Sequence, residues 1–100
     1  MIGVTVTFSY HGDFDRSRVA KVAENARTMF EGMPGLRYKF FTFDEKNQRA
    51  LNFYVWDSKE AAERFFTEEL RARVADLYGV APDITFVEVA EIVDNSTVQR

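Results

Sequence analysis

Three side chains, Asn52, Tyr54 and Trp56, alternate with aliphatic and aromatic ones along the stretch RALNFYVW (49–56). This alternation is typical of a β-strand, on which residues two apart share a face. An Asn amide and an indole N–H can both donate hydrogen bonds to a carbonyl or enolate oxygen as negative charge develops there. The three side chains are therefore candidates for binding a small molecule that carries such an oxygen.

His11 is the only histidine of the chain, and it follows the first predicted strand. Its imidazole titrates near neutral pH, so it could accept a proton, although a loop histidine is more often a solvated surface residue. With one His and no Cys, we expect no transition-metal site. Asp13 and Asp15 could suggest Mg²⁺, but capping of the next helix is the simpler explanation.

Arg37 and Lys39 alternate on the predicted strand 36–43, LRYKFFTF. Charged side chains on an edge strand prevent pairing with other chains. We therefore expect both to protect the edge of the sheet, while Arg37 could also bind an acidic group of a ligand.

The composition is that of one globular domain. The 100 residues are 46% hydrophobic and 15% aromatic, enough for a packed interior and an additional apolar pocket or interface. The net charge of −3 and the sequence pI of about 5.1 argue against a partner held by phosphate contacts, so we expect no nucleic acid. No apolar run approaches the ~20 residues that span a bilayer, and no secretory signal is visible. We therefore expect a cytoplasmic protein without membrane contacts.

Strands are predicted over 1–10, 36–43, 50–56 and 83–93, and one amphipathic helix between the first two of them, capped by Asp13 or Asp15. A second helix follows Asp57, its expected cap, and runs to Tyr78 with a kink or break along the way. The order βαββαβ predicts an α+β fold of the ferredoxin-like type, with a four-stranded antiparallel sheet and strands one and three in its middle. One domain covers 1–95, and 96–100 form a polar tail.

Both faces of the predicted sheet are apolar. Opposite faces are expected for Asn52, Tyr54 and Trp56 against Leu51, Phe53 and Val55, and for Leu36, Tyr38 and Phe40 against Phe41 and Phe43. Two helices can cover only one face, and an exposed apolar face of this extent is rare on a monomer. We therefore expect a second copy of the chain to cover the other face, which makes the protein a homodimer.

Four segments, FSYHGDF (8–14), MPGLRYKFF (33–41), NFYVWDSKEAAERFF (52–66) and VEVAEIVDN (87–95), resemble the dimeric α+β barrel superfamily. Within it the chain is most similar to the small YdhR-like mono-oxygenases, beside the antibiotic-biosynthesis monooxygenases. The resemblance implies two sheets that face each other in a dimer, with a hydrophobic pocket in each subunit between sheet and helices. It also implies oxidation of polycyclic aromatic substrates by O₂ without metal or flavin, with Asn52 and Trp56 matching an Asn/Trp pair of anthrone-oxidising relatives.

The predicted function is a cofactor-independent monooxygenase acting on an aromatic or quinone-like small molecule. Asn52 and Trp56 would orient the substrate and stabilise its anion, and His11 would accept the proton. The predicted substrate-binding residues are Tyr10, Arg37, Tyr38, Tyr54 and Phe65, with no metal and no other cofactor.

Two other functions fit the same pattern. A non-catalytic dimeric module for small-molecule binding or stress would have the same pocket, because a fold does not determine a function. An RNA-recognition module has the same element order, and Arg49, Phe53 and Trp56 fit its third-strand motif. Leu51, however, replaces an aromatic that should stack on a base, and the acidic balance also opposes RNA.

Overall fold

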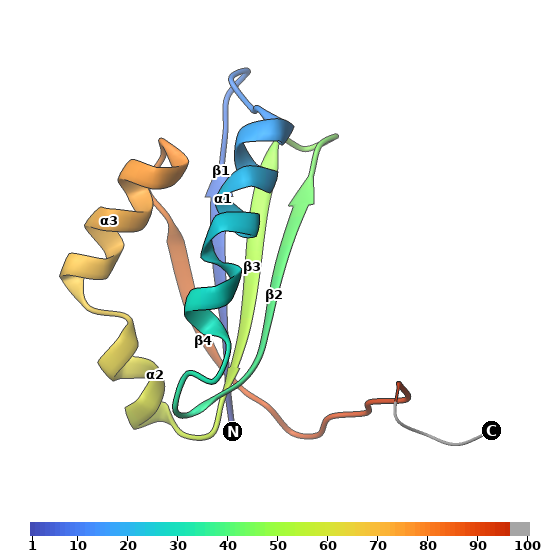
Figure 1. Cartoon of the computed structure of the whole chain (residues 1–100), viewed down its shortest axis with the longest axis vertical. Helices are drawn as coiled ribbons and strands as arrows, with labels where there is room; N and C mark the ends of the chain where they lie inside the picture. The colour runs from blue at the N-terminus through green and yellow to red at the C-terminus, as the bar shows by residue number, and fades with distance from the viewer. Residues whose placement is uncertain (97–100) are drawn as a thin grey trace.

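The computed structural model describes residues 1–96, which form a four-stranded antiparallel sheet and three helices (Figure 1). The strand order is β2-β3-β1-β4, so β1 and β3 lie in the middle as predicted, and the ferredoxin-like fold is confirmed. The helices all lie on one face of the sheet (Figure 1). The elements are β1 (Ile2–Ser9), α1 (Arg16–Phe30), β2 (Leu36–Asp44), β3 (Arg49–Trp56), α2 (Lys59–Phe65), α3 (Glu68–Tyr78) and β4 (Asp83–Glu88).

Each helix is preceded by a capping residue, whose side chain accepts a hydrogen bond from a backbone N–H of the first turn. Asp15, one of two predicted caps, accepts from the N–H of Arg18 (3.2 Å). The cap of α2 is Ser58 and not the predicted Asp57, because it is the Ser58 hydroxyl that accepts from the N–H of Ala61 (3.2 Å). Thr67 caps α3 in the same way, so the predicted second helix is broken in two just after Phe66.

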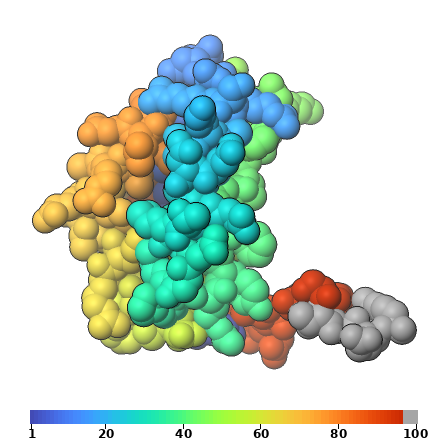
Figure 2. All heavy atoms as spheres, viewed as in Figure 1, coloured from blue at the N-terminus to red at the C-terminus, as the bar shows by residue number. Residues whose placement is uncertain are grey.

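β4 is shorter than predicted and ends at Glu88 instead of residue 93. Among residues 1–96 its one neighbour in the sheet is β1, whose first residue, Ile2, is already paired with Glu88. A strand can continue only where a partner strand offers backbone hydrogen bonds. The following segment, up to Ser96, therefore leaves the sheet and extends away from the body of the domain (Figures 1 and 2).

A β-bulge near Arg37 changes which side chains of β2 face the helices. Leu36 pairs with Trp56 and Tyr38 pairs with Val55, so one extra residue lies between them on β2. The bulge puts Leu36 on the helix side of the sheet, while Tyr38 lies on the other side. The prediction that these two side chains share a face was therefore wrong.

The two faces of the sheet have different surroundings. On the helix side, Val4 and Phe8 are 0% exposed and form the core with the helices, whose atoms cover this side in Figure 2. On the opposite side, called the open face below, Phe40 remains 52% exposed. The open face is formed by β2 and β3 with Tyr38, Phe40, Leu51, Phe53 and Val55 and by β4 with Val87.

Candidate functional site

Asn52, Tyr54 and Trp56 lie side by side on the helix side of β3, opposite Val6, Val4 and Ile2 of β1. All three are buried, with Trp56 only 1% exposed. The predicted common face is thus confirmed, and the structure adds that it is the face under the helices. Any chemistry of these side chains takes place inside the domain.

The Asn52 amide is held by the end of α3. Its Nδ2 atom donates a hydrogen bond to Tyr78 Oη (3.1 Å), and the Tyr78 ring stacks on Phe8 with 3.7 Å between ring centres. Gly79 ends the helix directly afterwards in the left-handed conformation, at φ 84°. An amide has two N–H donors, so this bond leaves the second one of Asn52 for another acceptor.

Tyr10 secures the same helix end, because its hydroxyl donates to the main-chain oxygen of Tyr78 (2.7 Å). Burial raises the pKa of Tyr10 and of Tyr78 above the usual tyrosine value. Both hydroxyls therefore stay protonated at neutral pH. The sequence predicted a helix that runs to Tyr78. The pairing of Tyr78 with Asn52, 26 positions away, depends on tertiary packing that the sequence does not display.

Around Tyr54 and Trp56 the side chains are almost all aromatic. The Trp56 ring centre lies 6.1 Å from Tyr54 and 5.2 Å from Phe65, and Phe30 of α1 lies 5.9 Å from Tyr54. We call this group, completed by Phe41, the aromatic enclosure. Trp56 Nε1 is buried in it and has no hydrogen-bond partner within the described residues.

Lys39 enters the aromatic enclosure from β2. Its Nζ lies 3.5 Å from the ring centre of Tyr54, 4.2 Å from that of Phe41 and 4.8 Å from that of Phe30. The amine is buried and, among residues 1–96, has no hydrogen-bond partner. Burial lowers its pKa to about 6, because a charged amine loses its hydration there.

Lys39 also lines a cavity of about 260 Å³. The cavity is lined by Lys39 and Phe41 of β2, by Arg27 and Phe30 of α1, and by Glu31. Its volume is just below the about 300–1,000 Å³ of common ligand pockets. Lys39 was predicted to guard the strand edge, and no sequence signal indicated the bulge that keeps it on the helix side.

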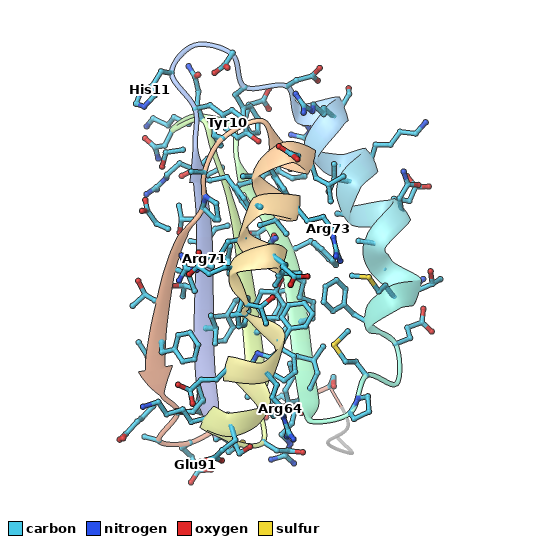
Figure 3. The ribbon with its side chains drawn as sticks, turned by 90° about the vertical axis from the view of Figure 1, so that its left-hand side faces the viewer. Tyr10, His11, Arg64, Arg71, Arg73 and Glu91 are labelled. Atoms are coloured by element: carbon cyan, nitrogen blue, oxygen red, sulfur yellow. The ribbon has the colours of Figure 1, made fainter. Side chains whose placement is uncertain are left out.

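Three predicted site residues lie elsewhere. His11 is exposed in the loop after β1 and points away from the domain (Figure 3). Trp56 pairs with Ile2 at the other end of β1, so His11 is about 30 Å from it along the strand at ~3.3 Å per residue. Arg37 is exposed at the bulge, with its Nε 3.4 Å from Asp57 Oδ1. The structure therefore does not bring His11 to Trp56, and Arg37 forms an ion pair at the surface.

Tyr38 lies on the open face, on the opposite side of the sheet from Asn52. With Phe40, Phe53 and Val55 it lines a second cavity of about 620 Å³, whose other wall is the segment 89–96. Its hydroxyl donates to Asp94 Oδ2 (3.4 Å). A single cavity shared by Tyr38 and Asn52, as predicted, is therefore not formed, whereas Phe65 and Tyr54 do share one enclosure.

Solved structures of other proteins have the same architecture, although no protein-family model and no curated protein matches the chain. The ActVA-Orf6 monooxygenase of Streptomyces coelicolor, solved with Nanaomycin D, is 20% identical, with a TM-score of 0.68 over 95% of this chain and 92% of that one. The fold is that of the antibiotic-biosynthesis monooxygenases.

Two further structures agree with it. SnoaB from Streptomyces nogalater, a cofactor-independent oxygenase, is 15% identical with a TM-score of 0.67, over 92% of this chain and 95% of that one. A candidate antibiotic-biosynthesis monooxygenase from Deinococcus radiodurans is 16% identical with a TM-score of 0.63, over 94% and 97% of the two chains. At these identities the likeness is one of fold.

No helix within residues 1–96 is long and apolar enough to cross a membrane.

Proposed function

We propose that this protein is a YdhR-like, cofactor-independent monooxygenase that oxidises an aromatic or quinone-like small molecule inside the aromatic enclosure. The observation that carries the proposal is the buried Trp56 Nε1, a hydrogen-bond donor that lies among aromatic rings and has no acceptor within residues 1–96. The fold supports it, since solved proteins of this fold include monooxygenases and a cofactor-independent oxygenase.

The unpaired indole N–H indicates what kind of ligand would fit. A buried donor without a partner costs about 1–3 kcal/mol, and such a group in a folded protein calls for an explanation. A ligand oxygen would supply the missing acceptor, and a flat aromatic skeleton would pack against Tyr54 and Phe65. A quinone, an anthrone or a polyhydroxylated aromatic combines both features.

The proposed reaction needs only the substrate and O₂. A base removes a proton from the activated ring carbon of an anthrone, and the electron pair of that C–H bond stays on the substrate as an enolate. The enolate gives one electron to O₂, and the two radicals combine into a C–O–O bond that takes up a proton. Loss of water then leaves a carbonyl, so CH₂ and O₂ become C=O and H₂O.

Asn52 and Trp56 would stabilise the enolate that starts this sequence. Trp56 offers its free indole N–H, and Asn52 offers the amide hydrogen that Tyr78 does not use. Fixed donors that face a developing oxyanion in a dry site are among the strongest catalytic devices, since they need no reorganisation.

We further propose that two copies of the chain pair through the open face. This face carries Phe40 at 52% exposure and Val87 at 43%, and none of the described helices covers it. Burying such a surface against an identical one is the simplest solution for a symmetric dimer. We expect the dimer to act in the cytoplasm, without nucleic acid or membrane partners.

The test is oxygen uptake by chelator-treated protein with dithranol, an anthrone, as the substrate. We expect one O₂ consumed for each quinone formed, at a rate well above that of the buffer. Uptake that requires added flavin or metal would contradict the proposal. Binding of the quinone without any uptake would favour the non-catalytic binding module instead.

A further inference from the structure

We propose that Lys39 is the proton acceptor of this reaction, because its amine lies against the rings of Tyr54, Phe41 and Phe30 in the aromatic enclosure. The inference rests on the proposed function and assigns its missing base. It replaces His11, which lies at the far end of β1 from Trp56 and outside the enclosure.

The position of the amine is the first reason. A lysine on a strand commonly extends its charged end into water and buries only its stem. Here the opposite holds, because Nζ is buried and faces the rings of Tyr54, Phe41 and Phe30 at 3.5–4.8 Å. The Lys39 side chain also lines the 260 Å³ cavity, together with Phe30 and Phe41 of the enclosure, so the cavity lies next to the buried amine.

The charges around Lys39 are the second reason. From α1 and its C-cap, Arg27 and Glu31 line the same cavity, but they pair with each other, with 3.9 Å between Nε and Oε1. On β3, the Tyr54 hydroxyl is neutral because burial raises its pKa. On α2, the ring centre of Phe65 lies 5.8 Å from that of Tyr54 and carries no charge. In the described part of the chain no carboxylate is therefore bonded to the amine, and burial lowers its pKa to about 6.

A neutral amine in this place can perform the first step of the reaction. Its lone pair takes the proton of the substrate, and the electrons of the broken bond remain on the substrate. The resulting ammonium stays beside the new anion and against the Tyr54 ring, which favours a cation. The proton later returns to the peroxide oxygen, and Lys39 ends the cycle as a free amine.

Lys39→Met is the decisive variant, because it keeps a flexible apolar stem of similar length and removes the amine. Lys39→Arg keeps a positive charge but cannot accept a proton at neutral pH. Lys46→Met, in the exposed turn between β2 and β3, is the matched control. The measurement is the rate of dithranol-dependent oxygen uptake from pH 5 to pH 9, corrected for the uncatalysed rate.

For the wild type and Lys46→Met we expect a rate that rises with pH through about 6, as the free amine forms. The rate should fall by about 10²–10⁴-fold in both Lys39→Met and Lys39→Arg, which is the usual contribution of a general base. The rise in rate near pH 6 should also disappear in both variants. Quenching of the single Trp56 by anthraquinone should show that both variants still bind.

Three results would count against the role of Lys39, and each is distinguishable from failure of the proposed function. A Lys39→Met variant with wild-type rate and pH profile would show that another group accepts the proton. Full activity of Lys39→Arg would mean that a fixed charge is enough. An NMR titration that gives the Lys39 amine a pKa near the ordinary value of about 10.4 would show that the amine is charged at neutral pH. If the wild type itself does not oxidise dithranol, the proposed function fails, and this inference fails with it.

Discussion

Lys39 and Tyr54 are direct partners across β2 and β3, and the amine of Lys39 lies 3.5 Å from the centre of the Tyr54 ring. The β-bulge near Arg37 sets this register. The amine of Lys39, a residue of the edge strand β2, therefore lies inside the domain, on the same side of the sheet as Asn52 and Trp56. The consequences of this contact can be measured in the stability of the protein as well as in its activity.

The buried amine should make the stability of the fold depend on pH. Its pKa is about 6 in the folded protein, against about 10.4 in an unfolded chain. Between these values only the unfolded chain holds the proton, so the free energy of unfolding rises with pH, by at most about 1.4 kcal/mol per pH unit. Below pH 6 the penalty is fully present, and above pH 10.4 it has disappeared.

Lys39→Met should remove that pH dependence. We expect the variant to be more stable than the wild type at pH 6, by a Tm difference of at least about 4–8 °C, the equivalent of 1 kcal/mol in a domain of this size. The difference should shrink as the pH approaches 9. Thermal unfolding of both proteins and of Lys46→Met between pH 6 and pH 9 measures this, and parallel plots of Tm against pH for Lys39→Met and the wild type would contradict the buried free amine.

The bond between Asn52 and Tyr78 should couple the middle of the sheet to the end of α3. Asn52→Ala and Tyr78→Phe should each cost about 1–3 kcal/mol, because each leaves a buried polar group without its partner. The double variant should cost less than the sum of the two, as expected for groups in contact. Urea titrations give the three values, and simple additivity would show that the bond contributes nothing.

Trp56→Phe should affect oxygenation more than it affects the fold. The change removes the indole N–H and makes a buried ring system smaller. We therefore expect moderate destabilisation but a kcat lower by about 10²–10³-fold, the effect of losing one oxyanion donor. Phe86→Leu removes a half-buried aromatic ring in β4 that packs against the core, without touching a donor. Oxygen uptake per folded protein should fall only in the first variant, and equal losses would assign Trp56 to packing alone.

The open face should determine the oligomeric state. Phe40 and Met29 are exposed to similar extents, 52% and 55%, but Phe40 belongs to the open face and Met29 to α1 on the helix side. A charge at Phe40 would be buried without a partner in the proposed dimer. Sedimentation should therefore give a monomer for Phe40→Glu and a dimer for Met29→Glu. A wild type that sediments as a monomer at tens of micromolar would exclude this dimer.

The sequence allowed the element order to be predicted because its signals are local. Alternation along 49–56 is enough to place Asn52, Tyr54 and Trp56 on one face, and the Gly and Pro residues at 32–35 are enough to separate α1 from β2. The early end of β4 is not local, since it depends on where β1 begins.

The candidate site was only partly predictable for the same reason. No residue in LRYKFF indicates the bulge. Lys39 was therefore predicted to protect the strand edge, and Tyr38 was predicted to share a cavity with Asn52, although the two lie on opposite sides of the sheet. His11 is chemically suitable, but its distance from Trp56 becomes visible only when the register of β1 and β3 is known. Tyr78 is a partner of Asn52 because α3 packs at that end of the sheet.

The most direct test of the account is an NMR titration of the uniformly ¹⁵N-labelled protein with anthraquinone. The chain has one tryptophan, so its indole N–H gives a single signal that reports on Trp56 without assignment. A ligand oxygen that accepts this hydrogen bond should shift that signal strongly and saturably. If it stays in place while amides of the open face, such as those of Phe53 and Val55, move instead, the ligand binds on the wrong side of the sheet and the account fails.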